Sequence, residues 1–124
     1  MEEGVIDFYK GYEGEPEIDF ILKDSSGGIF VVLKLWIRFF DSIMNLIKPN
    51  DNGLWEGLLI HYHLHTGWYD MPEWLCDNTY LFYNQLKGID IVSLSDTEIS
   101  VLTELMSLVK LSTILKYSLY IKYD

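Results

Sequence analysis

The sequence contains a single cysteine, Cys76, and a single arginine, Arg38, among its 124 residues. One thiol cannot form an internal disulfide, so the cysteine content gives no sign of an oxidising compartment. Lysine and arginine together number 9 against 19 aspartates and glutamates, which gives a formal net charge of −10. This shortage of basic residues argues against nucleic acid as a direct ligand and against an anionic membrane surface, because both require a basic footprint.

The sequence also lacks the features of a secretory leader and of a membrane span. Glu2, Glu3 and Asp7 stand where a signal peptide would carry basic residues. The longest apolar stretch, Ile29 to Ile47, is interrupted by polar residues at helical spacing, which is typical of a soluble helix. We therefore expect a cytoplasmic protein.

What the chain does have is enough apolar material for a core. Apolar residues make up 49% of the sequence and aromatic residues 15%, which excludes intrinsic disorder. The sequence shows no internal repeat, low-complexity tract or linker. A chain of this length is in the usual size range for one independently folding unit, so we predict a single domain over residues 1–124.

Four segments carry the signals of helices. The most apolar runs from Ile29 to Lys48, where polar residues recur every three or four positions and form one stripe. Such a pattern is typical of a helix that is buried on most of its circumference. Further helices are expected over residues 54–65, 70–87 and 95–115.

Two of these helices have clear start signals. Asp70 with Glu73, and Ser95 with Glu98, have the spacing of a capping box, in which each residue satisfies a free amide of the first turn. Gly88 supplies a stop for the first of these two helices.

The segment 54–65 has two interpretations. Its apolar residues fit a helical stripe, but they also alternate with the three histidines as in a strand. We favour the helix because Asp51 and Asn52 supply an N-cap.

The two ends of the chain carry the strand signals. Residues 17–23 alternate between apolar and charged positions, and residues 116–123 do the same, although there the preceding helix could also continue. Val5, Phe8, Tyr9 and Tyr12 have helical spacing, which is compatible with a short helix before Gly11. The predicted fold is therefore mainly α, a compact bundle of about four helices with a small terminal β element, and an α+β fold is the alternative.

The three histidines fall within five residues, at positions 61, 63 and 65. On a helix, His61 and His65 would share one face at the i, i+4 spacing that zinc enzymes use. Position 62 is tyrosine, so the zinc-protease pattern HExxH is absent, and no pair of cysteines accompanies the histidines. We predict no metal, no cofactor and no enzymatic activity, and the alternative is a small metal-dependent hydrolase that uses His61 and His65.

The negative charge is concentrated in two blocks. Residues 1–24 carry −6 and residues 50–109 carry −8, whereas residues 25–49 and 110–124 carry +2 each. The stretch 50–86 contains no lysine or arginine but many aromatic residues. Carboxylates combined with aromatic rings suit an interface for a basic protein. The residues that we expect at this interface are Glu13, Glu15, Glu17, Asp19, Asp51, Glu56, Trp68, Tyr69, Asp70, Glu73, Trp74 and Asp77.

The acidic stretch 13–19 and the base-free aromatic block 51–77 give the chain the character of a known type of protein. It resembles the bacterial immunity proteins, the antidotes encoded beside contact-dependent growth inhibition toxins and related polymorphic toxins. The resemblance implies tight, stoichiometric binding of one cognate toxin, often a basic nuclease whose active site is occluded. We therefore predict a protein that neutralises a basic partner, and the alternative is a phage-type acidic inhibitor that mimics DNA.

Overall fold

The computed structural model describes residues 4–124 and shows an α+β fold. Within these residues, five strands form one mixed sheet: β1 (Val5–Phe8), β2 (Glu17–Lys23), β3 (Ile29–Trp36), β4 (Trp74–Leu75) and β5 (Ser118–Tyr123). The strand order is β1-β3-β2-β5-β4, with β1 parallel to β3 and all other neighbours antiparallel. The prediction of a mainly helical bundle is therefore wrong, because the sheet is a central element of the fold.

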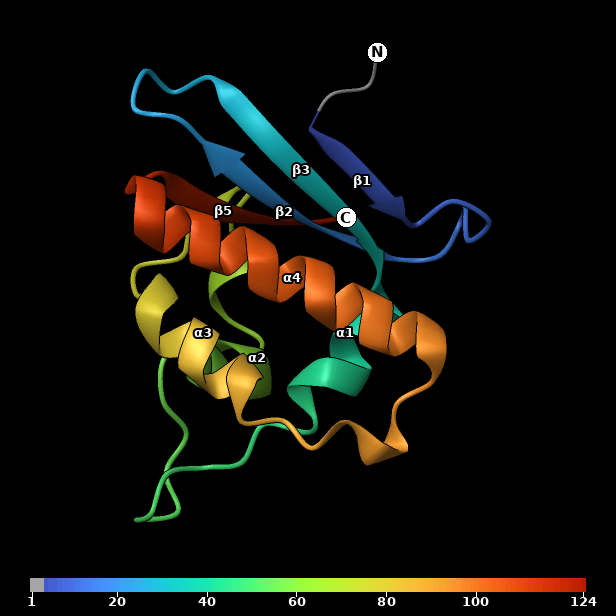
Figure 1. The fold of residues 1–124 in the computed structure, drawn as a ribbon, viewed down its shortest axis with the longest axis vertical. Coiled ribbons are helices and arrows are strands. Elements are labelled where there is room, and N and C mark those ends of the chain that lie inside the picture. The colour runs from blue at the N-terminus through green and yellow to red at the C-terminus, as the bar shows by residue number, and fades with distance from the viewer. Residues whose placement is uncertain (1–3) are drawn as a thin grey trace.

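Four α-helices and two short 3₁₀ helices lie outside the sheet in the described part of the chain. The α-helices are α1 (Ile37–Met44), α2 (Leu58–Leu64), α3 (Thr79–Lys87) and α4 (Asp96–Leu115), and the 3₁₀ helices are η1 (Gly67–Tyr69) and η2 (Ile91–Ser93). Figure 1 shows α4 crossing in front of the strands, with α1, α2 and α3 below it. No helix within residues 4–124 combines the length and the apolar character that crossing a bilayer requires.

Alternate residues of β2, β3 and β5 build the core. Their side chains on the helix side of the sheet have no exposed surface: Ile18, Phe20, Leu22, Leu33, Leu35, Leu119 and Ile121. The predicted strands at 17–23 and 116–123 are confirmed, and β2 pairs with β5 over six residues. The period-2 pattern of these strands is strong because one face packs against helices and the other does not.

The segment 29–48 is the largest correction. It is a strand over Ile29–Trp36 that continues directly into α1, not one helix. The isoleucine, valine and aromatic residues before Ile37 favour a strand, and pairing with both β1 and β2 satisfies its backbone. The four-residue spacing between Lys34 and Arg38 does not mark one face of a helix, since Lys34 lies on β3 and Arg38 lies on α1.

The N-terminal segment is also corrected. Residues 5–8 form β1 at the edge of the sheet and not the short helix before Gly11 that the spacing of the apolar residues allowed. The edge position buries Ile6 and Phe8 in part, while Val5 and Asp7 are more exposed.

The third correction concerns the start of α3. The expected capping box at Asp70 and Glu73 does not form, because residues 70–78 cross the edge of the sheet as β4 and a loop. The helix begins at Thr79, where the Asn78 side chain accepts a hydrogen bond from the amide of Leu81 at 3.0 Å. Its end at Gly88 is as predicted.

The remaining two helix predictions agree with the structure in type. The capping box of Ser95 and Glu98 is present and α4 ends at Leu115, as expected. The segment 54–65 contains the helix α2, but that helix begins at Leu58, so Asp51 and Asn52 do not cap it.

Candidate functional site

The region from α2 to β4 gathers aromatic rings, and each histidine lies against one of them. The three pairs, with the distances between ring centroids, are His61–Trp74 (4.7 Å), His63–Trp55 (4.0 Å) and His65–Tyr69 (4.6 Å). Each imidazole therefore belongs to a different local aromatic contact. Among residues 4–124, no three side chains of His, Cys, Asp or Glu are grouped so that they could hold a metal ion.

Backbone geometry explains why the histidines separate. His65 ends α2 in the left-handed conformation with a φ of 55°, which turns the chain away from the helix axis. Gly67 has a φ of 68°, and a Cβ there would lie 3.2 Å from the ring nitrogen Nδ1 of His61. The chain can make this turn beside His61 only with glycine at position 67.

Trp68, one of the aromatic residues expected at the interface, is part of the core. Its side chain is 1% exposed and packs against Phe40 and Trp74. Tyr69 and Trp74 are half-buried, so they offer only part of their rings to the surface. Cys76 is also buried, and burial raises the pKa of its thiol to about 12, which makes it a poor nucleophile at neutral pH.

Several candidate carboxylates are used within the protein. The Glu13 carboxylate accepts hydrogen bonds from the amide of Gly11, which lower its pKa, and Glu56 accepts one from the side chain of Asn50 at 2.6 Å. Glu73 forms an ion pair with Lys23 at 2.5 Å. These groups are already partly satisfied before any partner binds.

Three other carboxylates of the base-free block are free. Within residues 4–124, the exposed side chains of Asp51, Asp70 and Asp77 form no hydrogen bond and no ion pair. Free carboxylates can form ion pairs with a partner without breaking an internal contact first.

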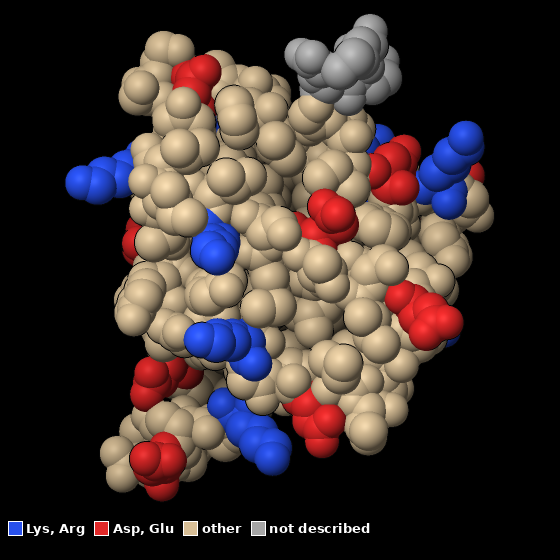
Figure 2. Space-filling view, in the orientation of Figure 1, with Lys and Arg blue, Asp and Glu red and all other residues tan. Residues whose placement is uncertain are grey.

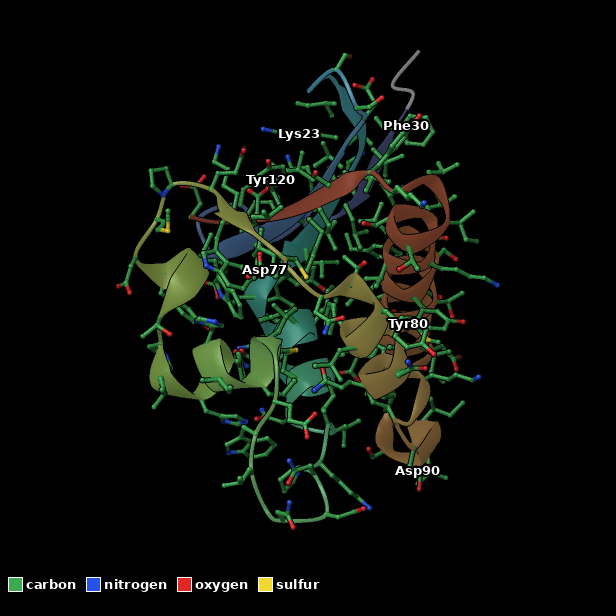
Figure 3. All side chains as sticks on the ribbon, turned by 90° about the vertical axis from the view of Figure 1, so that its left-hand side faces the viewer. Lys23, Phe30, Asp77, Tyr80, Asp90 and Tyr120 are labelled. Atoms are coloured by element: carbon green, nitrogen blue, oxygen red, sulfur yellow. The ribbon has the colours of Figure 1, made fainter. Side chains whose placement is uncertain are left out.

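Two cavities flank Asp77, which lines both of them. The smaller has a volume of about 180 Å³ and lies between α2, Trp74 and the first turn of α3, with apolar walls and His61 at its side. The larger has a volume of about 370 Å³ and a polar lining that includes Thr79, Thr113 and Lys116. Figure 3 shows Asp77 near the end of β4, beside α3. We call these two cavities, with the carboxylate between them, the Asp77 site.

The acidic stretch 13–19 does not join the Asp77 site. Glu13 and Glu15 are exposed in the loop that joins β1 to β2, which lies on the right in Figure 1, whereas α3 lies on the left. Glu17 and Asp19 lie on β2, on the face of the sheet away from the helices, where Glu17 is 3.6 Å from Lys34. The structure thus divides the expected interface into separate regions.

The face of the sheet away from the helices is the feature that sequence reasoning missed. The ammonium group of Lys23 lies over the ring of Tyr120, 4.5 Å from the ring centroid, and also forms the ion pair with Glu73. Figure 3 shows Lys23 and Tyr120 on the side of β5 that is turned away from the helices. The alternation of polar and apolar residues in β2 and β5 indicates that one face of these strands is open. The whole face could not be predicted, because β3, the strand between β1 and β2, was expected to be a helix.

Comparison with protein-family models, with curated proteins and with solved structures finds no match to this chain.

Proposed function

We propose that this protein binds and neutralises a basic protein partner, most simply a nuclease-type toxin encoded beside it, as an immunity protein does. Binding would be stoichiometric and would need no cofactor. Because such a toxin acts on nucleic acid inside the cell, the proposed place of action is the cytosol.

The observation that carries the proposal is the free carboxylate of Asp77 between two cavities. The smaller cavity has apolar walls from Leu58, Leu81 and Phe82, which suit the aliphatic part of an arginine or lysine side chain. The Asp77 carboxylate at its edge would pair with the charged end of that side chain. A buried arginine anchor of this kind is typical of the residues that dominate binding energy.

The distribution of charge supports the same orientation. Figure 2 shows acidic and basic side chains intermixed on the face that carries α3 and α4. The segments around the Asp77 site include the base-free stretch 50–86, with Asp51 and Asp70 as further free carboxylates. A basic partner would be attracted to these free carboxylates.

The test uses the C-terminal domain of the protein encoded directly upstream of this chain. We expect co-expression of the chain to restore growth of cells that produce this domain, and the purified pair to form a 1:1 complex in calorimetry. Asp77→Lys should weaken binding by at least about 100-fold, because it places a lysine where a basic side chain is expected to dock.

Glu104→Lys, on α4, changes the net charge by the same amount and is the matched control. We expect it to leave growth and affinity nearly unchanged. If the upstream domain does not bind, or if the two variants lower the affinity equally, the proposed function or its site is wrong.

A further inference from the structure

The face of the sheet that no helix covers has an ordered pattern of charge. We define this open face by the outward residues of the strands in two neighbouring rows. The first row is Asp7, Lys34, Asp19 and Lys122, which are direct register partners across β1, β3, β2 and β5. Carboxyl and ammonium groups alternate in this row from one strand to the next.

The side chains of this row lie close enough to influence one another. The charges of Glu17, Asp7 and Asp19 raise the pKa of Lys34, while its partial burial opposes them. Burial raises the pKa of Asp19, and the nearby Lys34 and Lys122 oppose that rise.

The second row is apolar and crosses all five strands. It consists of Val5, Val32, Ile21, Tyr120 and Leu75, again as direct register partners. Val5 is 41% exposed and Leu75 is 42% exposed, so the two ends of the row are open to solvent. Ile21 is buried, yet it does not belong to the main core, because it lies on the other side of the sheet.

The alternating row is complementary to a copy of itself. Consider a two-fold axis parallel to the strands and midway between β3 and β2. The rotation places Asp7 opposite Lys122 of a second copy, and Lys34 opposite Asp19 of that copy, so that every contact in the row joins a carboxyl group to an ammonium group. The same axis places Val5 opposite Tyr120 and Val32 opposite Ile21.

From this self-complementarity we infer that the open face binds a second copy of this chain, with the two sheets packed face to face. Such an interface is isologous, as two-fold dimers require. A uniformly basic partner would not fit, since it would meet Lys34 and Lys122. The inference does not depend on the proposed function. Leu75, at the β4 end of the row, also lines the larger cavity of the Asp77 site, but the two-fold axis places no strand of the second copy opposite it.

The size of the face predicts a weak dimer. Five strands spaced about 4.8 Å apart give a width of only about 24 Å. An interface of this size is at the lower end of those seen in specific complexes. We therefore expect a dissociation constant of about 10 to 500 μM, which is the range of transient association.

The experiment is sedimentation velocity of the full chain at concentrations up to about 1 mM. We expect the wild type to dimerise, and Asp7→Lys or Lys122→Asp alone to weaken the dimer at least about tenfold, because each creates two contacts between like charges. An equimolar mixture of the two variants should dimerise again, since in the mixed pair both contacts between positions 7 and 122 join opposite charges. Glu104→Lys, away from the open face, should dimerise like the wild type.

Three results would overturn the inference. The first is a wild type that stays monomeric over the whole range. The second is a dimer that both single variants retain, which would show that another surface associates. The third is a mixture that stays monomeric while both variants are folded by circular dichroism. If Asp7→Lys does not fold, Asp7→Asn mixed with Lys122→Asp replaces it, and the mixed dimer should then still exceed the Lys122→Asp homodimer.

Discussion

The two faces of the sheet are made from the same three strands but differ in burial and in composition. On the covered face, seven side chains of β2, β3 and β5 are without exposed surface and pack against helices. On the open face, the neighbouring positions of the same strands carry a row of alternating charges and a row of apolar residues. A shift of one position along β2 therefore separates a residue that stabilises the fold from one that is available for binding.

This difference leads to an order of expected effects. Substitutions on the covered face should change the free energy of unfolding strongly, because they leave cavities in a packed core. Substitutions on the open face should change it weakly, because exposed pairs contribute little. Variants of the two faces therefore test whether one face of the sheet stabilises the fold much more than the other.

The largest effect is expected for Phe20→Ala on the covered face. Phe20 has no exposed surface and contacts the rings of Phe40 and Phe82. We expect a loss of about 3 to 5 kcal/mol in the free energy of unfolding, measured by urea denaturation. Tyr120→Ala, on the open face, is the control and should cost much less. Equal losses for the two variants would contradict the division of the sheet into two unlike faces.

A smaller effect is expected at the helix that covers the sheet. Ser95→Ala removes the capping oxygen that accepts from the amide of Glu98 and should cost about 1 kcal/mol. Ser100→Ala, an exposed position within α4, makes the same chemical change without a cap and should be nearly neutral. The measurement is the midpoint of thermal unfolding, and a large effect of Ser100→Ala would argue against α4 as described.

The next effect depends on pH. Burial, together with the neighbouring Glu17, raises the pKa of Asp19 to about 8 from an ordinary value of 3.8. The unfolded chain releases this proton near pH 4, whereas the folded protein retains it up to about pH 8. The contribution of Asp19 to stability is therefore complete below pH 4 and is lost progressively as the pH rises to about 8.

Asp19→Asn removes this loss because asparagine does not titrate. We expect the variant to gain up to about 1 kcal/mol relative to the wild type between pH 4 and pH 8, a modest value because the side chain is partly exposed. Urea denaturation of both proteins at the two pH values measures the difference. A gain that is equal at both pH values would show that the carboxyl does not titrate in this range.

The smallest effect is expected for the ion pair on the open face. Glu17 lies 3.6 Å from Lys34, and both side chains are partly exposed. Glu17→Gln should change the free energy of unfolding by less than about 1 kcal/mol, and less still in 1 M salt. A loss of several kcal/mol, unaffected by salt, would show that the open face is part of the structural core.

The sequence predicted those elements whose pattern has one physical cause. The alternation at 17–23 arises from a single buried face, and the capping box at Ser95 is a local interaction, so both were found. The segment 29–48 was mistaken because a central strand and the following helix share an apolar composition and no loop separates them. Only pairing with β1 and β2 distinguishes the strand, and pairing is not a local property.

The candidate site was predicted in part. Asp77 and the other free carboxylates were among the residues expected at an interface, because the absence of lysine near them is visible in the sequence. The division of the acidic residues between the Asp77 site and the open face was not predictable, since it depends on how the strands are ordered. The burial of Trp68 likewise depends on its packing against Phe40, which comes from a distant segment.

The most direct test of the proposed Asp77 site is the salt dependence of association with the domain encoded upstream. Stopped-flow measurements between about 50 and 500 mM salt should show an association rate that falls steeply for the wild type and for Glu104→Lys. For Asp77→Lys we predict a slower association with a shallower dependence on salt. Identical salt dependence for Asp77→Lys and the wild type would contradict the account.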